Sequence, residues 1–145
     1  MLNTQKFSVN SVSESPAKTK IKTRGFEFLV DEPEELGGSN EAPNPVEYVL
    51  AGYAGCINVV AHIVAKELNI NLKNLEIFIE GDINPSRLFG HSFNDRAGYQ
   101  SLKVRLKTSA KINKGLEVKW LKEIEERCPV NDNLSNKTPI QLTLN

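Results

Sequence analysis

The chain has 145 residues, of which 18 are basic and 18 acidic, so its formal net charge is zero. This length predicts a single domain over residues 1–145 and is enough to bury a core without disulfides or metals. The neutral charge gives no support to nucleic-acid binding, which normally needs a basic patch. We expect no membrane span of roughly 20 apolar residues, and residues 1–10 lack the apolar stretch of a signal peptide. The expected protein is therefore cytoplasmic, with no nucleic-acid or membrane partner.

The N-terminal third contains short strand-like runs separated by turns. Phe26, Phe28 and Val30 occupy alternate positions, and an alternating basic stretch around Ile21 precedes them. Such alternation is typical of antiparallel strands with one solvated face. Residues 31–45 then hold three prolines and a pair of glycines, which predicts a loop.

A long helix is expected to begin at Pro45, with Asn44 as its N-cap, and to end near Asn69. Its apolar residues recur at three- and four-residue steps: Val46, Val49, Leu50, Tyr53, Ile57, Val60, Val64 and Leu68. No charge falls between Glu47 and Lys66, so the helix is apolar nearly all round. A helix of about 22 residues is about 33 Å long, and a chain of this size has little left to cover it. We expect it to pack against a second copy of the chain; the alternative is a helix wrapped fully by its own chain.

Two further strands and a second helix follow. Alternation over 75–80 and 102–107 predicts strands on either side of a loop at 84–100, and alternation over 140–144 predicts a last strand. The second helix is expected to run from about Leu116 to Cys128, because Pro129 disfavours helical geometry at the residue before it. The residues assigned to its apolar face are Trp120, Leu121, Ile124 and Cys128.

Two cysteine motifs carry a family resemblance. The segment from Asn44-Pro45 to Gly55-Cys56 resembles the opening of the central helix in the OsmC/Ohr family, with a cysteine eleven residues after the proline. Cys128-Pro129-Val130 resembles the second-cysteine motif of the family, and the order of the elements also fits. The resemblance spans most of the chain. It implies an α+β, OsmC-like fold in which a strongly bent antiparallel sheet surrounds a long central helix, in an intertwined homodimer.

The resemblance also implies a chemistry. Peroxidase members of the family reduce organic hydroperoxides, a role in oxidative stress. Cys56 would attack the peroxide and become a sulfenic acid, and Cys128 would resolve it as an intramolecular disulfide. Dithiols of the lipoyl type would then reduce that disulfide, with no metal, flavin or haem as cofactor. From composition alone, two buried and inert thiols are the alternative.

The acidic residue of the pattern is displaced in this chain. Peroxidase members place a glutamate directly after the proline, where this sequence has Val46, and Glu47 comes one position later. Glu47 and Cys56 are nine residues apart, so on one helix they lie about 180° and roughly 13 Å from each other. A catalytic Glu47 would therefore serve the cysteine of the other subunit. The alternative is a first-turn carboxylate that the helix dipole favours.

The activating arginine of the family is also missing from its place. The strand before the loop has Leu29 near that position, and Arg24, Arg87 and Arg96 are the other candidates, each of which is more readily a surface charge. These departures leave a second hypothesis open. It is a non-peroxidase OsmC-like dimer that binds a small hydrophobic molecule or has a stress-related structural role.

The remaining polar residues suggest no further site. His62 lies about 240° round the helix from Cys56 and His91 falls in a loop, so neither is favoured as a catalytic base. Two cysteines and two histidines without short paired spacing give no zinc motif. The basic face of Lys103, Arg105 and Lys107 is interpreted as solvated sheet rather than a nucleic-acid surface.

Overall fold

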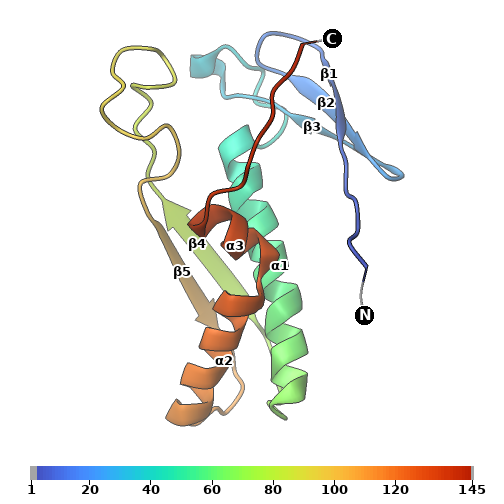
Figure 1. Cartoon of the computed structure of the whole chain (residues 1–145), viewed down its shortest axis with the longest axis vertical. Helices are drawn as coiled ribbons and strands as arrows, with labels where there is room; N and C mark the ends of the chain where they lie inside the picture. The colour runs from blue at the N-terminus through green and yellow to red at the C-terminus, as the bar shows by residue number, and fades with distance from the viewer. Residues whose placement is uncertain (1–2, 145) are drawn as a thin grey trace. The chain divides into compact units, whose positions relative to one another are not determined.

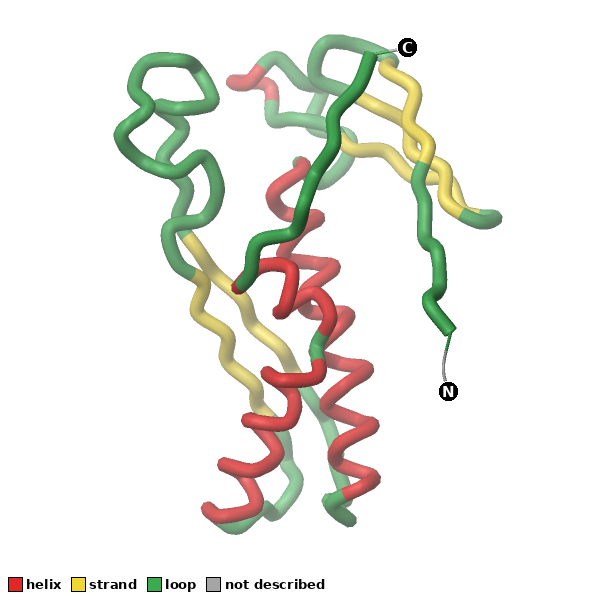
Figure 2. Tube along the Cα trace, in the orientation of Figure 1, coloured by secondary structure: helices red, strands yellow, loops and turns green. Residues whose placement is uncertain are grey.

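A computed structural model describes residues 3–144 and confirms the α+β class. The chain divides into two compact units, one ending at Val49 and the other beginning at Leu50. The expected single domain over residues 1–145 stays a prediction. Figures 1 and 2 show the helices and strands, which are β1 (Asn10–Ser13), β2 (Thr19–Thr23), β3 (Phe26–Val30), η1 (Glu34–Leu36), α1 (Pro45–Glu67), β4 (Glu76–Gly81), β5 (Leu102–Lys107), α2 (Lys114–Arg127) and α3 (Pro129–Ser135). The sheet expected around the long helix is present as two separate antiparallel sheets, β1-β2-β3 and β4-β5.

The first unit contains the three-stranded sheet. The strand predicted from the alternation of Phe26, Phe28 and Val30 is β3, which pairs with β2 from Thr19↔Val30 to Thr23↔Phe26. Val30 is buried, whereas Phe26 is exposed. The ring of Phe28 lies 5.4 Å from the ring of Tyr48, the fourth residue of α1.

The loop between β3 and α1 is organised by the buried carboxylate of Asp31. This carboxylate accepts hydrogen bonds from the backbone N–H groups of Glu32 (2.9 Å), Ser39 (3.1 Å) and Glu41 (3.1 Å). A Cβ at Gly38 would lie 1.8 Å from the carbonyl oxygen of Glu32, so only glycine fits there. The predicted loop is confirmed, and backbone-to-carboxylate bonds give it a fixed shape.

Replacing Asp31 with asparagine is expected to lower thermal stability at neutral pH. Burial raises the pKa of Asp31, but the N–H groups of Glu41, Glu32 and Ser39 outweigh burial and hold it below its ordinary value of 3.8. A carboxyl with a lowered folded-state pKa contributes stability above its unfolded pKa, and loses that contribution as the pH falls through the folded value. Thermal unfolding from pH 7 to pH 2 should therefore show a steep loss below about pH 4 in the wild type and a shallower one in Asp31→Asn.

Glu35→Gln is the control for this substitution, because Glu35 is an exposed carboxylate in η1 of the same loop. It should unfold like the wild type at every pH. If Asp31→Asn and the wild type lose stability equally as the pH falls, the buried Asp31 carboxylate is not the cause of the acid sensitivity.

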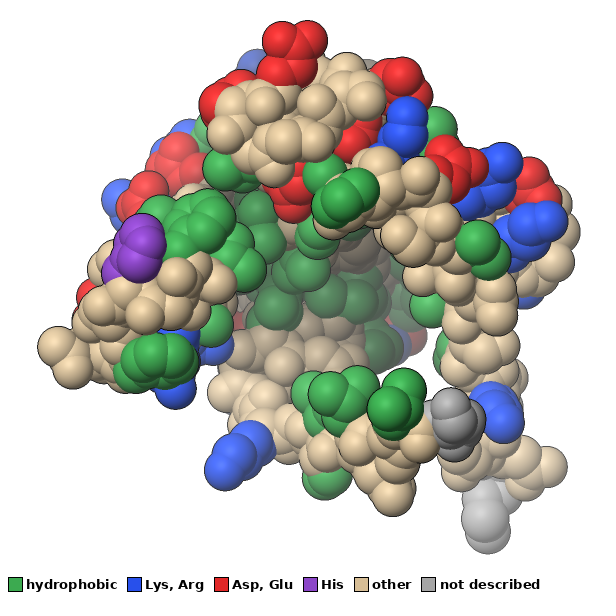
Figure 3. All heavy atoms as spheres, turned by 90° about the horizontal axis from the view of Figure 1, so that it is seen from above, with side chains coloured by type: hydrophobic (Ala, Val, Ile, Leu, Met, Phe, Trp, Pro, Cys, Tyr) green, Lys and Arg blue, Asp and Glu red, His purple; other side chains and the backbone are tan. Residues whose placement is uncertain are grey.

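The long apolar helix is confirmed as α1, with 23 residues against about 22 predicted. Asn69 follows its end with φ = 56°, in the left-handed region common at helix C-termini. Six of its residues are buried: Tyr53, Ile57, Val60, Ala61, Val64 and Ala65. Within the second unit, Val59 and Ile63 of this helix are 56% and 45% exposed. Figure 3 shows apolar side chains reaching the surface, and packing against a second copy stays a prediction.

The expectation that no segment could span a membrane is wrong for α1. By length and composition this helix passes the test for a span, with a mean hydropathy of 1.6 and 33% of its most apolar window buried. One such helix is weak support for a membrane span, since the core helix of a soluble protein has the same character. The high hydropathy of α1 comes from the stretch without charges between Glu47 and Lys66. The buried side chains of this stretch belong to the hydrophobic core.

The core of the second unit lies between α1, α2 and the β4-β5 ribbon. Trp120 and Ile124 of α2 are buried together with Ile57 and Val64 of α1, and the Trp120 Nε1–H donates to the carbonyl oxygen of Ala61 at 3.0 Å. The apolar side chains of β4 and β5 cover this cluster; they are Ile77, Ile79, Leu102, Val104 and Leu106. The two predicted strands and the second helix are thus confirmed, with α2 beginning two residues before the expected start.

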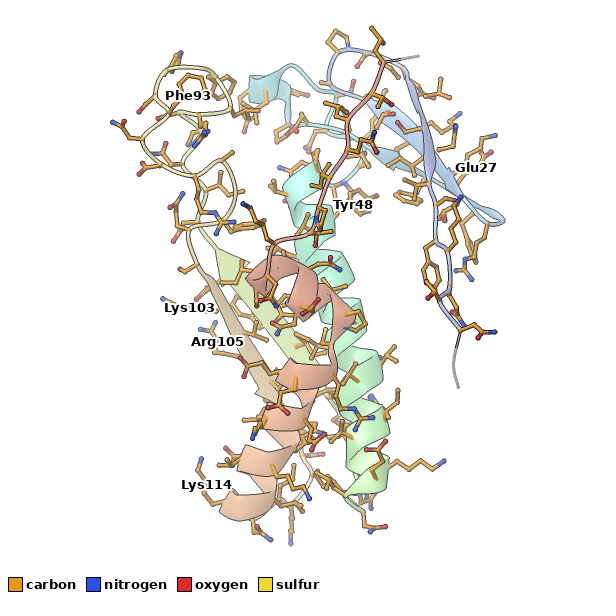
Figure 4. All side chains as sticks on the ribbon, viewed as in Figure 1. Glu27, Tyr48, Phe93, Lys103, Arg105 and Lys114 are labelled. Atoms are coloured by element: carbon orange, nitrogen blue, oxygen red, sulfur yellow. The ribbon has the colours of Figure 1, made fainter. Side chains whose placement is uncertain are left out.

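One side chain of this unit departs from its predicted environment. Leu121 was assigned to the apolar face of the second helix but is 40% exposed. On the outer face of β5, Lys103 and Arg105 point away from the helices (Figure 4), and Arg105 lies 3.4 Å from Glu80. Lys107 lies 3.3 Å from Glu76. Carboxylates on β4 therefore face two of the three basic side chains of this strand.

The last predicted strand is wrong. Residues 140–144 form neither strand nor bridge, and Ile140, Leu142 and Leu144 are 88%, 95% and 100% exposed. The alternation is real, but a strand also needs a neighbour for its backbone hydrogen bonds. Within residues 3–144 the segment has no such neighbour.

Candidate active site

The two cysteines meet in the second unit. Cys56 lies on α1 and is half-buried, whereas Cys128 lies at the junction of α2 and α3 and is 1% exposed. Both are free thiols, and their Sγ atoms are 2.9 Å apart, with the Cys128 thiol placed to donate to Cys56. A disulfide bond is about 2.05 Å long, so the two sulfurs need to approach by less than about 1 Å to form one. The fold thus brings together two residues that are 72 positions apart in sequence.

The backbone conformation of Cys128 is set by the proline that follows it. Cys128 has φ = −81° and ψ = 112°, the extended geometry that Pro129 imposes on the preceding residue. The predicted end of α2 is therefore confirmed. Pro129 then opens α3, a short helix that the sequence analysis missed, and the backbone N–H of Asn131 donates to Cys128 Sγ at 3.4 Å. Cys128 is thus the N-cap of α3 and the sulfur is held at its first turn.

The surroundings of Cys128 favour its protonated form. Burial raises the pKa of its thiol, and the hydrogen bond to Cys56 raises it further, while the N–H groups of Asn131 and Val130 act in the opposite direction. A thiol that keeps its proton can donate it to a neighbouring sulfur. Cys128 is therefore arranged as the hydrogen-bond donor of the pair.

Tyr53 is a member of the site that the sequence analysis placed only in the core. It precedes Cys56 by one helical turn, is 8% exposed, and its hydroxyl donates to Asn131 Oδ1 at 2.6 Å. Burial raises the pKa of Tyr53, and the nearby charges of Cys128, Glu125 and Cys56 add to the increase. The three-residue spacing of Tyr53 and Cys56 was the available signal, because residues i and i+3 share a helix face.

Glu47 exchanges two hydrogen bonds with Asn44 at the start of α1. Its Oε2 accepts from the backbone N–H of Asn44 at 2.8 Å, and its own N–H donates to Asn44 Oδ1 at 2.9 Å. This reciprocal pair is a capping box, and it confirms Asn44 as the N-cap of α1. The catalytic role predicted for Glu47 remains a prediction, and the observed contacts are those of a first-turn carboxylate.

Two of the three candidate arginines have partners of their own. Arg24 lies over the ring of Phe26, 5.1 Å from its centroid, and Arg87 Nη1 donates to the carbonyl oxygen of Asp95 at 3.1 Å. Arg96 lies in the same loop as Arg87. Within the second unit, the partner of Arg87 is thus a backbone carbonyl and not a thiol.

One further arginine stands next to the site. Arg127 immediately precedes Cys128, and its guanidinium binds both carboxylate oxygens of Glu67, at 2.5 and 2.9 Å. The Glu67 carboxylate raises the pKa of Arg127 and has its own pKa lowered in return. This pair joins the ends of α1 and α2 and is a structural link.

The histidines take no part in the thiol pair. His62 Nδ1 lies 2.8 Å from the carbonyl oxygen of Asn58 on the exposed side of α1, and the ring of His91 lies 6.0 Å from that of Phe89. Across residues 3–144, no group of three or more His, Cys, Asp and Glu side chains is arranged to hold a metal ion.

A family model described as OsmC-like protein matches residues 38–143, well over half of the chain. This chain belongs to the OsmC-like family. The matched region contains Cys56, Cys128 and the whole second unit except its last two residues.

Solved structures of the OsmC-like family agree with the fold. An OsmC-like protein from Mycoplasma pneumoniae superposes with a TM-score of 0.77 at 15% identity, covering 90% of this chain and 88% of its own. The organic hydroperoxide resistance protein OsmC from Legionella pneumophila gives 0.68 at 19% identity, with 92% and 91% covered. An organic hydroperoxide resistance protein from Elizabethkingia anophelis gives 0.64 at 20% identity, with 91% and 89% covered. A comparison with curated proteins found no match.

Proposed function

We propose that this OsmC-like protein reduces organic hydroperoxides with Cys56 as the peroxidatic thiol and Cys128 as the resolving thiol. The observation that carries the proposal is the 2.9 Å separation of the two free sulfur atoms. Two similar structures bear the name organic hydroperoxide resistance protein, which supports this substrate class.

The first step is assigned to Cys56 because it is the more accessible sulfur of the pair. Its thiolate attacks the outer oxygen of the hydroperoxide, so that an S–O bond forms as the O–O bond breaks. The sulfur is oxidised by two electrons to a sulfenic acid, and the alkoxide takes up a proton and leaves as the alcohol. The Cys128 thiol, 2.9 Å away, is placed to donate to the Cys56 sulfur before this attack.

The second step joins the two sulfurs. Cys128 attacks Cys56, an S–S bond forms as the S–O bond breaks, and the hydroxide leaves with the Cys128 proton as water. A dithiol of the lipoyl type then reduces the disulfide by thiol–disulfide exchange and becomes a disulfide itself. The cycle needs no metal, flavin or haem. It suits a reducing compartment such as the cytoplasm, where a permanent Cys56–Cys128 disulfide is not favoured.

We also propose that the protein acts as a homodimer. The exposed Val59 and Ile63 on α1 and the unpaired apolar segment at 140–144 are surfaces that a second copy would cover.

A second candidate is an OsmC-like protein that binds a small hydrophobic molecule without reducing peroxides. It is favoured by the contacts of Arg24 and Arg87, which engage groups other than the thiols.

Steady-state consumption of cumene hydroperoxide by the reduced protein, with dihydrolipoamide as reductant, separates the two candidates. We expect continuous turnover that disappears when the thiols are first alkylated. Absence of turnover, with both thiols intact after exposure to the hydroperoxide, would favour the binding protein.

The role of Glu47 is tested by Glu47→Gln, which keeps an oxygen acceptor for the Asn44 N–H and removes the charge. Because the carboxylate already serves the capping box, we expect turnover within about threefold of the wild type. Asn44→Ala, the matched loss of the cap, should cost about 1 kcal/mol of stability. A tenfold or greater loss of turnover in folded Glu47→Gln would establish the catalytic role, on the scale of a lost acid–base group.

A further inference from the structure

Two contacts join α1 to the start of α3, one turn apart. Tyr53 and Cys56 are three residues apart on α1, and Asn131 and Cys128 are three residues apart on the facing segment, so each pair shares one face. The two sulfurs form one contact, at 2.9 Å, and Tyr53 Oη with Asn131 Oδ1 forms the other, at 2.6 Å. The Asn131 N–H, bonded to Cys128 Sγ at 3.4 Å, links the two contacts.

The orientation of the Asn131 amide is fixed by its partners. Its Nδ2 donates to the carbonyl oxygen of Glu125 at 3.0 Å, and a carbonyl can only accept. The Oδ1 atom therefore faces Tyr53, and the Tyr53 hydroxyl must be the donor. Asn131 is thus held by Glu125 of α2 on one side and by Tyr53 of α1 on the other. It lies in the first turn of α3, the helix that Cys128 caps.

We propose that Tyr53 is a positioning residue for the resolving step, acting through Asn131 to hold Cys128 against Cys56. This inference rests on the proposed two-cysteine function and assigns a residue to its second half. The hydroxyl donates to Asn131 and not to a sulfur. Its effect is to keep the first turn of α3 against α1, and with it the sulfur of Cys128.

The need for such a link arises after the first oxidation. In the reduced protein the thiol of Cys128 donates to Cys56 Sγ, and this contact itself holds the sulfurs together. Oxidation of Cys56 inserts an oxygen at that sulfur and replaces this hydrogen bond. The Tyr53–Asn131 bond involves neither sulfur, so it persists and keeps Cys128 within reach of the sulfenic acid.

The test separates attack by Cys56 from closure by Cys128, using the chromogenic disulfide dithiobisnitrobenzoate. The first release of thionitrobenzoate reports attack by Cys56, and the second reports closure by Cys128 on the mixed disulfide. In Tyr53→Phe we expect an unchanged first phase and a second phase slowed about threefold to tenfold, the range for one lost neutral hydrogen bond. Asn131→Ala also loses the bond to Glu125, so it should slow the same phase at least as much. The double variant should be no slower than Asn131→Ala, because the Tyr53 hydroxyl acts through Asn131.

Tyr48→Phe is the matched control, since Tyr48 also lies on α1 and its hydroxyl donates over the same distance, 2.6 Å, but to the carbonyl oxygen of Leu29. It should leave both phases unchanged. A second phase in Tyr53→Phe within about 1.5-fold of the wild type, less than one hydrogen bond contributes, would overturn the inference. So would equal slowing of both phases.

The same variants treated with one equivalent of cumene hydroperoxide test the link in the proposed reaction. Tyr53→Phe should yield more sulfenic acid trapped by dimedone than the wild type does, with disulfide formation delayed. If the thiols do not react with the hydroperoxide, the proposed function is wrong. If Tyr53→Phe still slows only the second release of thionitrobenzoate in that case, the positioning role of Tyr53 stands without it.

Discussion

Cys56→Ser is expected to abolish the reduction of cumene hydroperoxide, lowering turnover at least about a thousandfold, because a serine hydroxyl at neutral pH is not a comparable nucleophile. Cys128→Ser should consume one equivalent of hydroperoxide per chain and then stall, with the sulfenic acid at Cys56 accumulating. The difference follows from the order of the two steps, since Cys128 enters only after Cys56 is oxidised. Rapid mixing with mass analysis of dimedone-trapped protein measures both outcomes.

Serine at position 128 is a well-matched replacement for structural reasons. Cys128 caps α3 by accepting from the Asn131 N–H, and serine is among the preferred N-cap residues. The variant should therefore fold like the wild type, and a changed reaction can be assigned to the missing thiol. Full turnover in Cys56→Ser, or loss of turnover in Cys128→Ser without any trapped sulfenic acid, would contradict the assigned roles.

Trp120→Ala is expected to cause the largest loss of stability, about 3–5 kcal/mol, the range for truncating a buried aromatic residue. Trp120 of α2 is 3% exposed and packs against α1, where its Nε1–H donates to the carbonyl oxygen of Ala61 at 3.0 Å. Trp120→Phe keeps most of the volume but removes the indole hydrogen bond, so it should cost a smaller amount, about 0.5–1.5 kcal/mol. Urea unfolding followed by circular dichroism is the measurement, because Trp120 is the only tryptophan of the chain and its fluorescence is lost in both variants.

The control for this pair is Val118→Ala on the same helix. Val118 is 56% exposed, so its truncation should change stability by no more than about 0.5 kcal/mol. A cost for Trp120→Ala as small as that of Val118→Ala would mean that α2 does not pack on α1 through this residue.

Local sequence patterns predicted two of the helix boundaries but missed one short helix. Pro45 with Asn44 marked the start of α1, and Pro129 marked the end of α2, because both act through the backbone of adjacent residues. The short α3 was missed because its seven residues carry no apolar periodicity. Its start depends on the sulfur of Cys128 acting as a cap.

The strands show a different limit. Alternation predicted β4 and β5 correctly because the two runs pair with each other in the same unit. The same alternation at 140–144 predicted a strand that is absent, since the pattern describes side-chain faces and says nothing of a partner for the backbone.

The candidate site was predicted residue by residue but not as an arrangement. The motifs around Cys56 and Cys128 indicated both thiols, yet their approach to 2.9 Å depends on how α2 packs on α1. Tyr53 appeared only as a core residue, because its partner Asn131 lies 78 positions away, in the helix that was missed. Interactions of such long sequence separation are properties of the packed fold.

The most direct test of the two-cysteine assignment is a single-turnover reaction of the reduced protein with one equivalent of cumene hydroperoxide. Peptide mapping by mass spectrometry without reduction would identify the product, and chromatography would quantify the alcohol. We predict one equivalent of cumyl alcohol and a disulfide linking Cys56 to Cys128 within one chain. Intact hydroperoxide together with two unmodified thiols would contradict the account, and so would a product in which either cysteine is bonded to a second chain.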